Sequence, residues 1–180
     1  RYPSARSPVA ADNLVAADGA GMNHRVLGRS GVIVIAVAVV LCDQLSKAWI
    51  TALLSDGRSI KVVPGLLDLR LVHNTGAAFS LLRGATPLLA LLSLVVVIAV
   101  LIWLWRQQRL PIWQGLAVGF LLGGSLGNGL DRWRLGYVVD FLALVPIDFP
   151  IFNPADVAIN LAVICFAVDL WSNRSGIRRG

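Results

Sequence analysis

Four long apolar runs constrain the fold of this 180-residue chain more than any other feature. They cover approximately residues 31–50, 86–105, 112–130 and 154–171, about 18–20 residues each. At a rise of about 1.5 Å per residue, each run can cross the roughly 30 Å hydrocarbon core of a bilayer. Backbone N–H and C=O groups in lipid must be paired within the protein, so each run is predicted to be a transmembrane helix.

The overall composition excludes most other classes of protein. Hydrophobic residues make up 57% of the chain and charged residues 14%, whereas a soluble domain carries about 25% charged residues. A soluble domain of this size could not bury so much apolar surface, and the composition is equally unlike a disordered or disulfide-rich secreted chain. The net charge is +6, but no basic stripe with interleaved aromatic residues is present, so no nucleic-acid partner is expected.

The distribution of basic residues predicts how the helices cross the membrane. Two loops, 51–85 and 131–156, carry six basic and six acidic residues between them, so their net charge is near zero. The basic residues on the other side are Arg25, Arg29, Arg106, Arg109, Arg174, Arg178 and Arg179. Because basic residues mark the cytoplasmic side, we expect four transmembrane helices with both termini cytoplasmic and both long loops outside. All six tryptophans fall at predicted helix ends, where aromatic side chains meet the membrane interface.

The predicted organisation is a mobile tail over residues 1–30, one four-helix membrane domain over 31–172, and a basic cytoplasmic tail over 173–180. The only methionine, Met22, marks a candidate natural start within the first tail. In the first outer loop, residues 59–63 and 67–72 alternate apolar and polar side chains around Pro64-Gly65. This pattern predicts a hairpin, and therefore a small extracytoplasmic β-sheet.

Polar residues within the apolar runs are costly, so they require a packing or functional explanation. Asp43 and Lys47 lie four residues apart in the first run, on one helix face, with the acid first as an ion pair prefers. A structural ion pair is favoured over direct catalysis. Small residues at 123, 124 and 127 in the third run predict close helix packing. Asn128, Asp131 and Arg132, at its outer end, are interpreted as a scaffold, and Arg132 could bind a carboxylate with two bonds.

Two further aspartates follow in contrasting surroundings. Asp140 lies between Val139 and Phe141, where loss of solvent would favour the protonated acid, although a solvated loop acid is the alternative. Asn153 and Pro154 are a favourable cap and first residue for the fourth helix. Asp156 then falls in its first turn, where the helix dipole favours the carboxylate, and a simple capping charge is the alternative.

Carboxyl groups whose environments separate their pKa values are typical of a general acid and a general base. If Asp140 and Asp156 meet, they could share one proton and activate a water for attack on an amide. The chain has no His-Glu-x-x-His pattern, so no metal is expected.

Four blocks carry a resemblance to a known family: residues 43–47, 74–80, 123–132 with 136–141, and 152–156. Together, in this order, they resemble the lipoprotein signal peptidases (signal peptidase II) of bacteria, over about residues 25–172. The resemblance implies an aspartic endopeptidase without metal or cofactor. Such an enzyme removes the signal peptide of a prolipoprotein just before a diacylglyceryl-modified cysteine, at the outer surface of the cytoplasmic (inner) membrane.

The same resemblance assigns roles to individual residues. The catalytic pair falls on Asp140 and Asp156. Supporting positions fall on Asp43, Lys47, Asn74, Gly124, Asn128, Arg132, Asn153 and Ala155. It also implies that the outer sheet cradles the substrate, that a loop or short helix covers the site, for which residues 141–152 are the candidate, and that the antibiotic globomycin blocks the pair. Expected partners are the prolipoprotein and membrane lipids, with the enzyme as a monomer.

Two other classes of function are alternatives. A small ion or solute transporter could use Asp43, Lys47 and Asp131 as a polar path, and a non-catalytic assembly subunit would need no such residues. A transporter is expected to place titratable groups through the depth of the membrane, often in repeated halves. Here the titratable groups gather on one side and no repeat is seen, which favours the enzyme.

Overall fold

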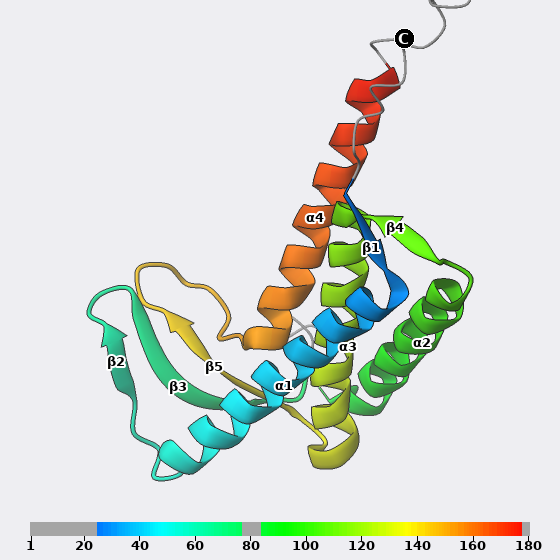
Figure 1. Cartoon of the computed structure of the whole chain (residues 1–180). Coiled ribbons are helices and arrows are strands. Elements are labelled where there is room, and N and C mark those ends of the chain that lie inside the picture. Colours follow the sequence, from blue (N-terminus) through cyan, green and yellow to red (C-terminus); the bar gives the residue numbers. More distant parts are fainter. Residues whose placement is uncertain (1–24, 77–83, 178–180) are drawn as a thin grey trace, which may run out of the picture.

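Within the described residues, four helices form the body of the molecule, and Figure 1 shows their arrangement. The computed structural model describes residues 25–76 and 84–177, with side chains described as far as residue 172. The helices are α1 (Arg29–Leu53), α2 (Thr86–Trp105), α3 (Ile112–Leu135) and α4 (Pro154–Ile177). Each overlaps one predicted apolar run, and α3 packs against the other three.

The helices differ in how apolar they are. By length and composition, α1, α2 and α4 (as far as Ser172) could each cross a membrane, whereas α3 is not apolar enough to meet the same criterion. Its position explains the difference. Eleven residues of α3 are buried, including several glycines and the polar Ser125, Asn128 and Asp131. A helix surrounded by protein has less need of an apolar surface than one exposed to lipid.

Glycines allow α3 to approach its neighbours closely, as predicted. A Cβ atom at Gly123 would lie 2.6 Å from Cβ of Val39 in α1, and one at Gly124 would lie 2.6 Å from the carbonyl oxygen of Ala155 in α4. Neither separation is possible for a real Cβ atom, so these contacts require residues without a side chain.

A three-stranded antiparallel sheet lies at one end of the bundle (Figure 1). Its strands are β2 (Ile60–Val63), β3 (Leu67–Asn74) and β5 (Val138–Leu144), in the order β2-β3-β5. The predicted hairpin is confirmed, with Gly65 at a φ of 76° in the turn. The sequence predicts a loop over residues 131–156 and does not predict β5 within it. β5 is a strand because its backbone pairs with β3, more than 60 residues earlier, and Leu142 also pairs with Phe152.

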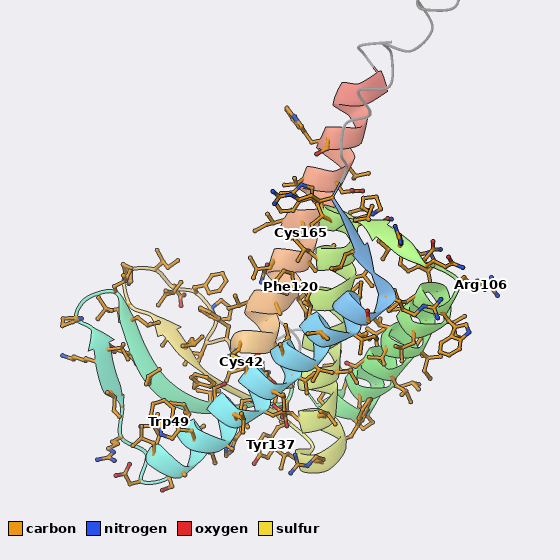
Figure 2. The ribbon with its side chains drawn as sticks, in the orientation of Figure 1. Cys42, Trp49, Arg106, Phe120, Tyr137 and Cys165 are labelled. Atoms are coloured by element: carbon orange, nitrogen blue, oxygen red, sulfur yellow. The ribbon has the colours of Figure 1, made fainter. Side chains whose placement is uncertain are left out.

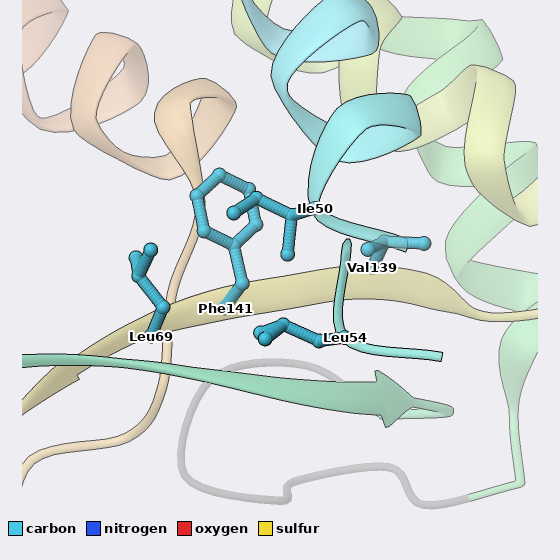
Figure 3. Packing of buried hydrophobic residues seen from close by; sticks show 5 residues of the cluster. All are labelled: Ile50, Leu54, Leu69, Val139 and Phe141. Carbon is cyan, nitrogen blue, oxygen red and sulfur yellow. The ribbon is translucent and has the colours of Figure 1, made fainter. Parts of the chain in front are cut away.

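The sheet is fixed to α1 by a compact apolar cluster (Figure 3). Ile50 and Leu54, at the end of α1, pack against Leu69 of β3 and against Val139 and Phe141 of β5. Successive side chains of a strand point to opposite faces. The residue between Val139 and Phe141 is therefore directed away from this cluster.

The opposite end of the bundle holds a two-stranded ribbon of β1 (Val26–Gly28) and β4 (Arg109–Pro111). Residues 1–30 were predicted as a tail, but β1 is a strand and α1 begins at Arg29; residues 1–24 lie outside the described residues. β1 is ordered by a pairing partner some 80 residues away, which its own sequence does not reveal. Likewise, α4 continues to Ile177, into the segment predicted as the final tail.

The side chains show which ends of the helices lie together (Figure 2). Trp49, on α1, lies at the end that carries the three-stranded sheet, and Arg106, just after α2, lies at the other end. This agrees with the grouping of loops that the sequence predicted.

Candidate active site

A reciprocal cap forms the start of α4. The side-chain oxygen of Asn153 accepts a hydrogen bond from the backbone N–H of Asp156 at 3.0 Å. Oδ2 of Asp156 accepts one from the backbone N–H of Asn153 at 3.2 Å. This is the capping-box arrangement, with Pro154 at the first helical position. The predicted cap is confirmed, and it leaves Oδ1 of Asp156 free for a partner outside the cap.

Asp140 occupies the middle of β5 and is only 2% exposed, so the alternative of a solvated loop acid is wrong. Its Oδ2 accepts a hydrogen bond from Nδ2 of Asn74 at 2.8 Å, and its Oδ1 accepts one from Nδ2 of Asn153 at 2.6 Å. The pKa of Asp140 is raised to about 6, mainly by burial; the charge of Asp156 also raises it, whereas the hydrogen bond from Asn74 lowers it. The group therefore titrates near pH 6.

Two asparagines join the carboxyl groups of Asp140 and Asp156. Asn153 donates from its side chain to Asp140 and from its backbone to Asp156. Nδ2 of Asn128 donates to Oδ1 of Asp156 at 2.8 Å, while its Oδ1 accepts from Nδ2 of Asn153 at 3.1 Å. The two acids, sixteen residues apart, thus belong to one hydrogen-bonded cluster.

Lys47 contacts this hydrogen-bonded cluster through Asn128. Its ammonium contacts Asp43 at 2.9 Å, Asp131 at 2.8 Å and Oδ1 of Asn128 at 3.2 Å. The predicted ion pair with Asp43 is confirmed. An ammonium group has three protons, so each has an acceptor. The bond to Asn128 fixes which end of that amide faces Asp156.

The two acids paired with Lys47 also hold the backbone that carries the candidate residues. Oδ1 of Asp43 accepts from the backbone N–H of Ala155 at 3.0 Å, at the start of α4. Oδ2 of Asp131 accepts from the backbone N–H of Val139 at 3.1 Å, just before Asp140. The scaffold role predicted for Asp131 agrees with this contact.

Sequence reasoning missed Gln44. Its Nε2 lies 3.1 Å from Oδ2 of Asp43, 2.9 Å from Oδ1 of Asp131 and 3.2 Å from the carbonyl oxygen of Gly127. It therefore binds the two acids that flank Lys47. The available signal was an amide side chain within an apolar run, immediately after a charged residue that also lies there.

Arg132 reaches across the site. Its Nη2 donates to the carbonyl oxygen of Gly76 at 3.2 Å, beyond the end of β3, and Nη1 lies 3.5 Å from the carbonyl oxygen of Asn128. Nε is buried without a hydrogen-bond partner among the described residues. No ion pair between Arg132 and a carboxylate is formed within those residues.

The structure thus brings together the ten residues that the resemblance assigns to the site. Gly124 completes the set by allowing close contact with Ala155, and Gly76 orients Asn74 by donating to its Oδ1 at 2.9 Å. Residues 77–83, which include part of the second matching block, lie outside the described residues. In the part of the chain that the structure describes, no group of three His, Cys, Asp or Glu side chains could hold a metal ion.

Comparison with known proteins gives a single answer. The family described as "Signal peptidase (SPase) II" matches residues 35–172. A lipoprotein signal peptidase of Parasynechococcus marenigrum (strain WH8102) is 59% identical over 159 residues, which cover 88% of this chain and 100% of that protein. The chain belongs to the signal peptidase II family.

Other signal peptidase II relatives and solved structures agree. A lipoprotein signal peptidase of Synechococcus sp. (strain RCC307) is 51% identical over 147 residues, 81% of this chain and 97% of that protein. A solved structure, titled as a bacterial membrane enzyme studied by the in meso method at 2.3 Å resolution, has a TM-score of 0.75 at 32% identity. It covers 82% of this chain and 91% of the solved chain. The resemblance inferred from the four sequence blocks is confirmed.

Proposed function

We propose that Asp140 and Asp156 are the catalytic pair of this signal peptidase II, a lipoprotein-processing protease by family. The substrate is a prolipoprotein, and the bond cleaved precedes its diacylglyceryl-modified cysteine. One observation carries the assignment: Asn153 donates to both carboxyl groups, at 2.6 Å to Asp140 and 3.2 Å to Asp156. If Asn153 and Asp156 served only to cap α4, Asn153 would not need to bind Asp140 as well.

The mechanism follows from the protonation of this pair. Two nearby carboxylates in a buried site favour holding one proton between them. The ionised member takes a proton from a bound water, which attacks the scissile carbonyl carbon. The protonated member stabilises the oxyanion of the tetrahedral intermediate and then protonates the leaving amine. The pair titrates as a unit, so either acid can begin the cycle.

Arg132 is a candidate ligand for the substrate backbone. Its buried Nε–H has no partner among the described residues, although the guanidinium group is held by Gly76 and Asn128. An unpaired buried donor is costly, and a peptide carbonyl would satisfy it. We assign Arg132 to orienting the substrate beside the pair.

The membrane arrangement is part of the same proposal. All four helices cross the membrane, with α3 shielded by the other three. Both termini lie in the cytoplasm, and the β2-β3-β5 sheet and catalytic pair lie at the outer face of the inner membrane. The support is the excess of basic residues near the ribbon of β1 and β4 and the near-neutral loops at the other end. The enzyme acts as a monomer on a substrate whose lipid chains stay in the bilayer, and globomycin is expected to occupy the pair.

The test is to replace each acid with its amide. Asp140→Asn and Asp156→Asn should each lower the rate of cleavage of a lipid-modified prolipoprotein at least about 100-fold, the usual contribution of a general acid or base. Asp148→Asn, an exposed position in the segment that follows β5, is the matched control and should retain the normal rate. A folded Asp140→Asn or Asp156→Asn enzyme with the normal rate would show that the assignment is wrong.

A further inference from the structure

An apolar groove of about 410 Å³ runs between α3 and α4 and extends to Trp103 of α2. Each long wall is a stripe of side chains spaced three or four residues apart, from Gln114 to Leu121 on α3 and from Ile159 to Phe166 on α4. No charged residue lines it, and its surface is almost wholly apolar. The groove takes no part in the hydrogen-bonded cluster described above.

The shape of the groove suits a helix. Side chains at such spacing form the continuous face that receives a helix in helix-in-groove recognition. Ala117 and Ala162, near the middle of the two stripes, are buried and small, so a helix backbone could approach closely. Val163 and Phe166 are 65% and 49% exposed, so the groove opens outward rather than into the protein core.

One end of the groove lies directly beside the candidate active site. Ile159 is three residues after Asp156 on α4, about one helical turn away. Its Cγ1 would lie 2.7 Å from a Cβ atom at Gly124, a residue already placed in the site. From Ile159 the wall continues to Phe166, about 10 Å along the helix axis, away from the catalytic pair. The groove therefore begins about one helical turn from Asp156.

We propose that this groove binds the apolar segment of the substrate's signal peptide as a helix. The inference rests on the proposed function. A signal peptide contains about 7–15 apolar residues before its cleavage site. When the scissile bond is at the catalytic pair, this segment must leave the site through the hydrocarbon region, where its backbone must be helical. The groove supplies an uncharged path that starts about one helical turn from Asp156 and runs in that direction.

Two neighbouring positions on α4 separate binding in the groove from general effects. Val163→Trp places a large side chain in the groove, whereas Ile164→Trp places it on a similarly exposed surface, 57% exposed, that does not line the groove. Two substrates are compared: a complete lipid-modified prolipoprotein, and a short lipopeptide that spans the cleavage site but lacks the apolar segment. Neither position belongs to the catalytic machinery.

We expect Val163→Trp to lower kcat/KM for the complete substrate about tenfold, mainly through KM, which corresponds to about 1.4 kcal/mol. Cleavage of the short lipopeptide should not change, and Ile164→Trp should resemble the unmodified enzyme with both substrates. Equal effects of the two variants, or no effect of Val163→Trp on the complete substrate, would overturn the proposal. Continued cleavage of the lipopeptide would show that the catalytic assignment stands independently.

Photocrosslinking identifies the occupant directly. A benzophenone amino acid replaces Phe166 in the Asp156→Asn enzyme, which should retain uncleaved substrate, in vesicles that contain the complete prolipoprotein. A crosslink to the apolar segment of the signal peptide, absent when the probe is at Ile164, is the expected result. Crosslinks to lipid alone would mean that an acyl chain fills the groove, and the proposal would be wrong.

Discussion

Gly124→Ala tests whether the close contact of α3 with α4 sets the geometry of the catalytic pair. The added Cβ would lie 2.6 Å from the carbonyl oxygen of Ala155 and 2.7 Å from Cγ1 of Ile159. Real Cβ atoms essentially never approach another heavy atom within 3.0 Å. The closer neighbour is backbone, so no side-chain rotation can relieve the contact, and the start of α4 must move by at least a few tenths of an ångström.

The expected change in stability is small because two effects oppose each other. Overpacking a filled interface costs about 1–3 kcal/mol. Replacing glycine by alanine within a helix returns about 1 kcal/mol. The free energy of unfolding should therefore fall by no more than about 2 kcal/mol, and the protein should fold.

The expected change in activity is larger. Asn153 and Asp156 lie in the part of α4 that must move, while Asn128 and Gly124 are on α3. The bonds that join the pair span this interface, at 2.8 Å from Asn128 to Asp156 and 3.1 Å from Asn153 to Asn128. A displacement of about 1 Å at a reacting centre can cost about 100-fold in rate. We expect a fall in kcat of about tenfold or more.

The assay measures thermal unfolding of the purified enzyme in detergent, together with kcat and KM for a lipid-modified prolipoprotein. Gly129→Ala is the matched control. It gains the same helix propensity on α3, but its Cβ would meet side-chain atoms instead of backbone, Cβ of Ser93 at 3.2 Å and Cζ2 of Trp133 at 3.4 Å. The reasoning is refuted if Gly124→Ala retains the normal kcat, or if both variants lose activity equally.

Four further outcomes are expected. Lys47→Met leaves two buried carboxylates without their cation and should lower the free energy of unfolding by about 3–5 kcal/mol. The control, Arg58→Met, breaks an exposed ion pair and should change the free energy of unfolding by less than about 1 kcal/mol. Equal changes in the two variants would contradict this prediction. Asn74→Ala removes a bond that lowers the pKa of Asp140, so the pH–rate profile should move to higher pH; an unchanged profile would count against it. Because the folded pKa of Asp140 is about 6 against an ordinary 3.8, its contribution to stability is fully present below about pH 4. About 3 kcal/mol should be lost as the pH rises through 6, and denaturation at several pH values should show that Asp140→Asn removes this dependence. Cysteine at Arg58 should react with an impermeant reagent outside intact cells and cysteine at Gln107 should not; the reverse would invert the proposed topology.

The sequence predicts the helices well because their signal is local. A helix that faces lipid must be apolar over about 20 consecutive residues, and this can be counted without knowing what it packs against. The cap at Asn153 and the ion pair of Asp43 with Lys47 are equally local, since each depends on residues three or four positions apart. Both were predicted from spacing alone, and both are present.

The contacts that create the site are not local. Asn74 meets Asp140 across 66 positions, and Asn128 meets Asp156 across 28. β5 exists because β3 offers it a partner, and nothing within residues 138–144 distinguishes a strand from an apolar loop that contains an acid. The sequence could therefore indicate which polar residues are costly to place in an apolar segment, but not which of them would contact one another.

Charge balance explains why the pKa of Asp140 is raised in the assembled site. Four carboxyl groups gather there, those of Asp43, Asp131, Asp140 and Asp156, but only Lys47 forms ion pairs with any of them among the described residues. Its partners are the two acids that anchor the backbone, so the proposed catalytic pair is left with amide donors instead of a paired cation. Amides stabilise a carboxylate less than a direct ion pair does, and burial opposes a second negative charge. The asparagines therefore orient Asp140 and Asp156 without neutralising them, which is the condition under which a pair of acids retains the one proton that its chemistry requires.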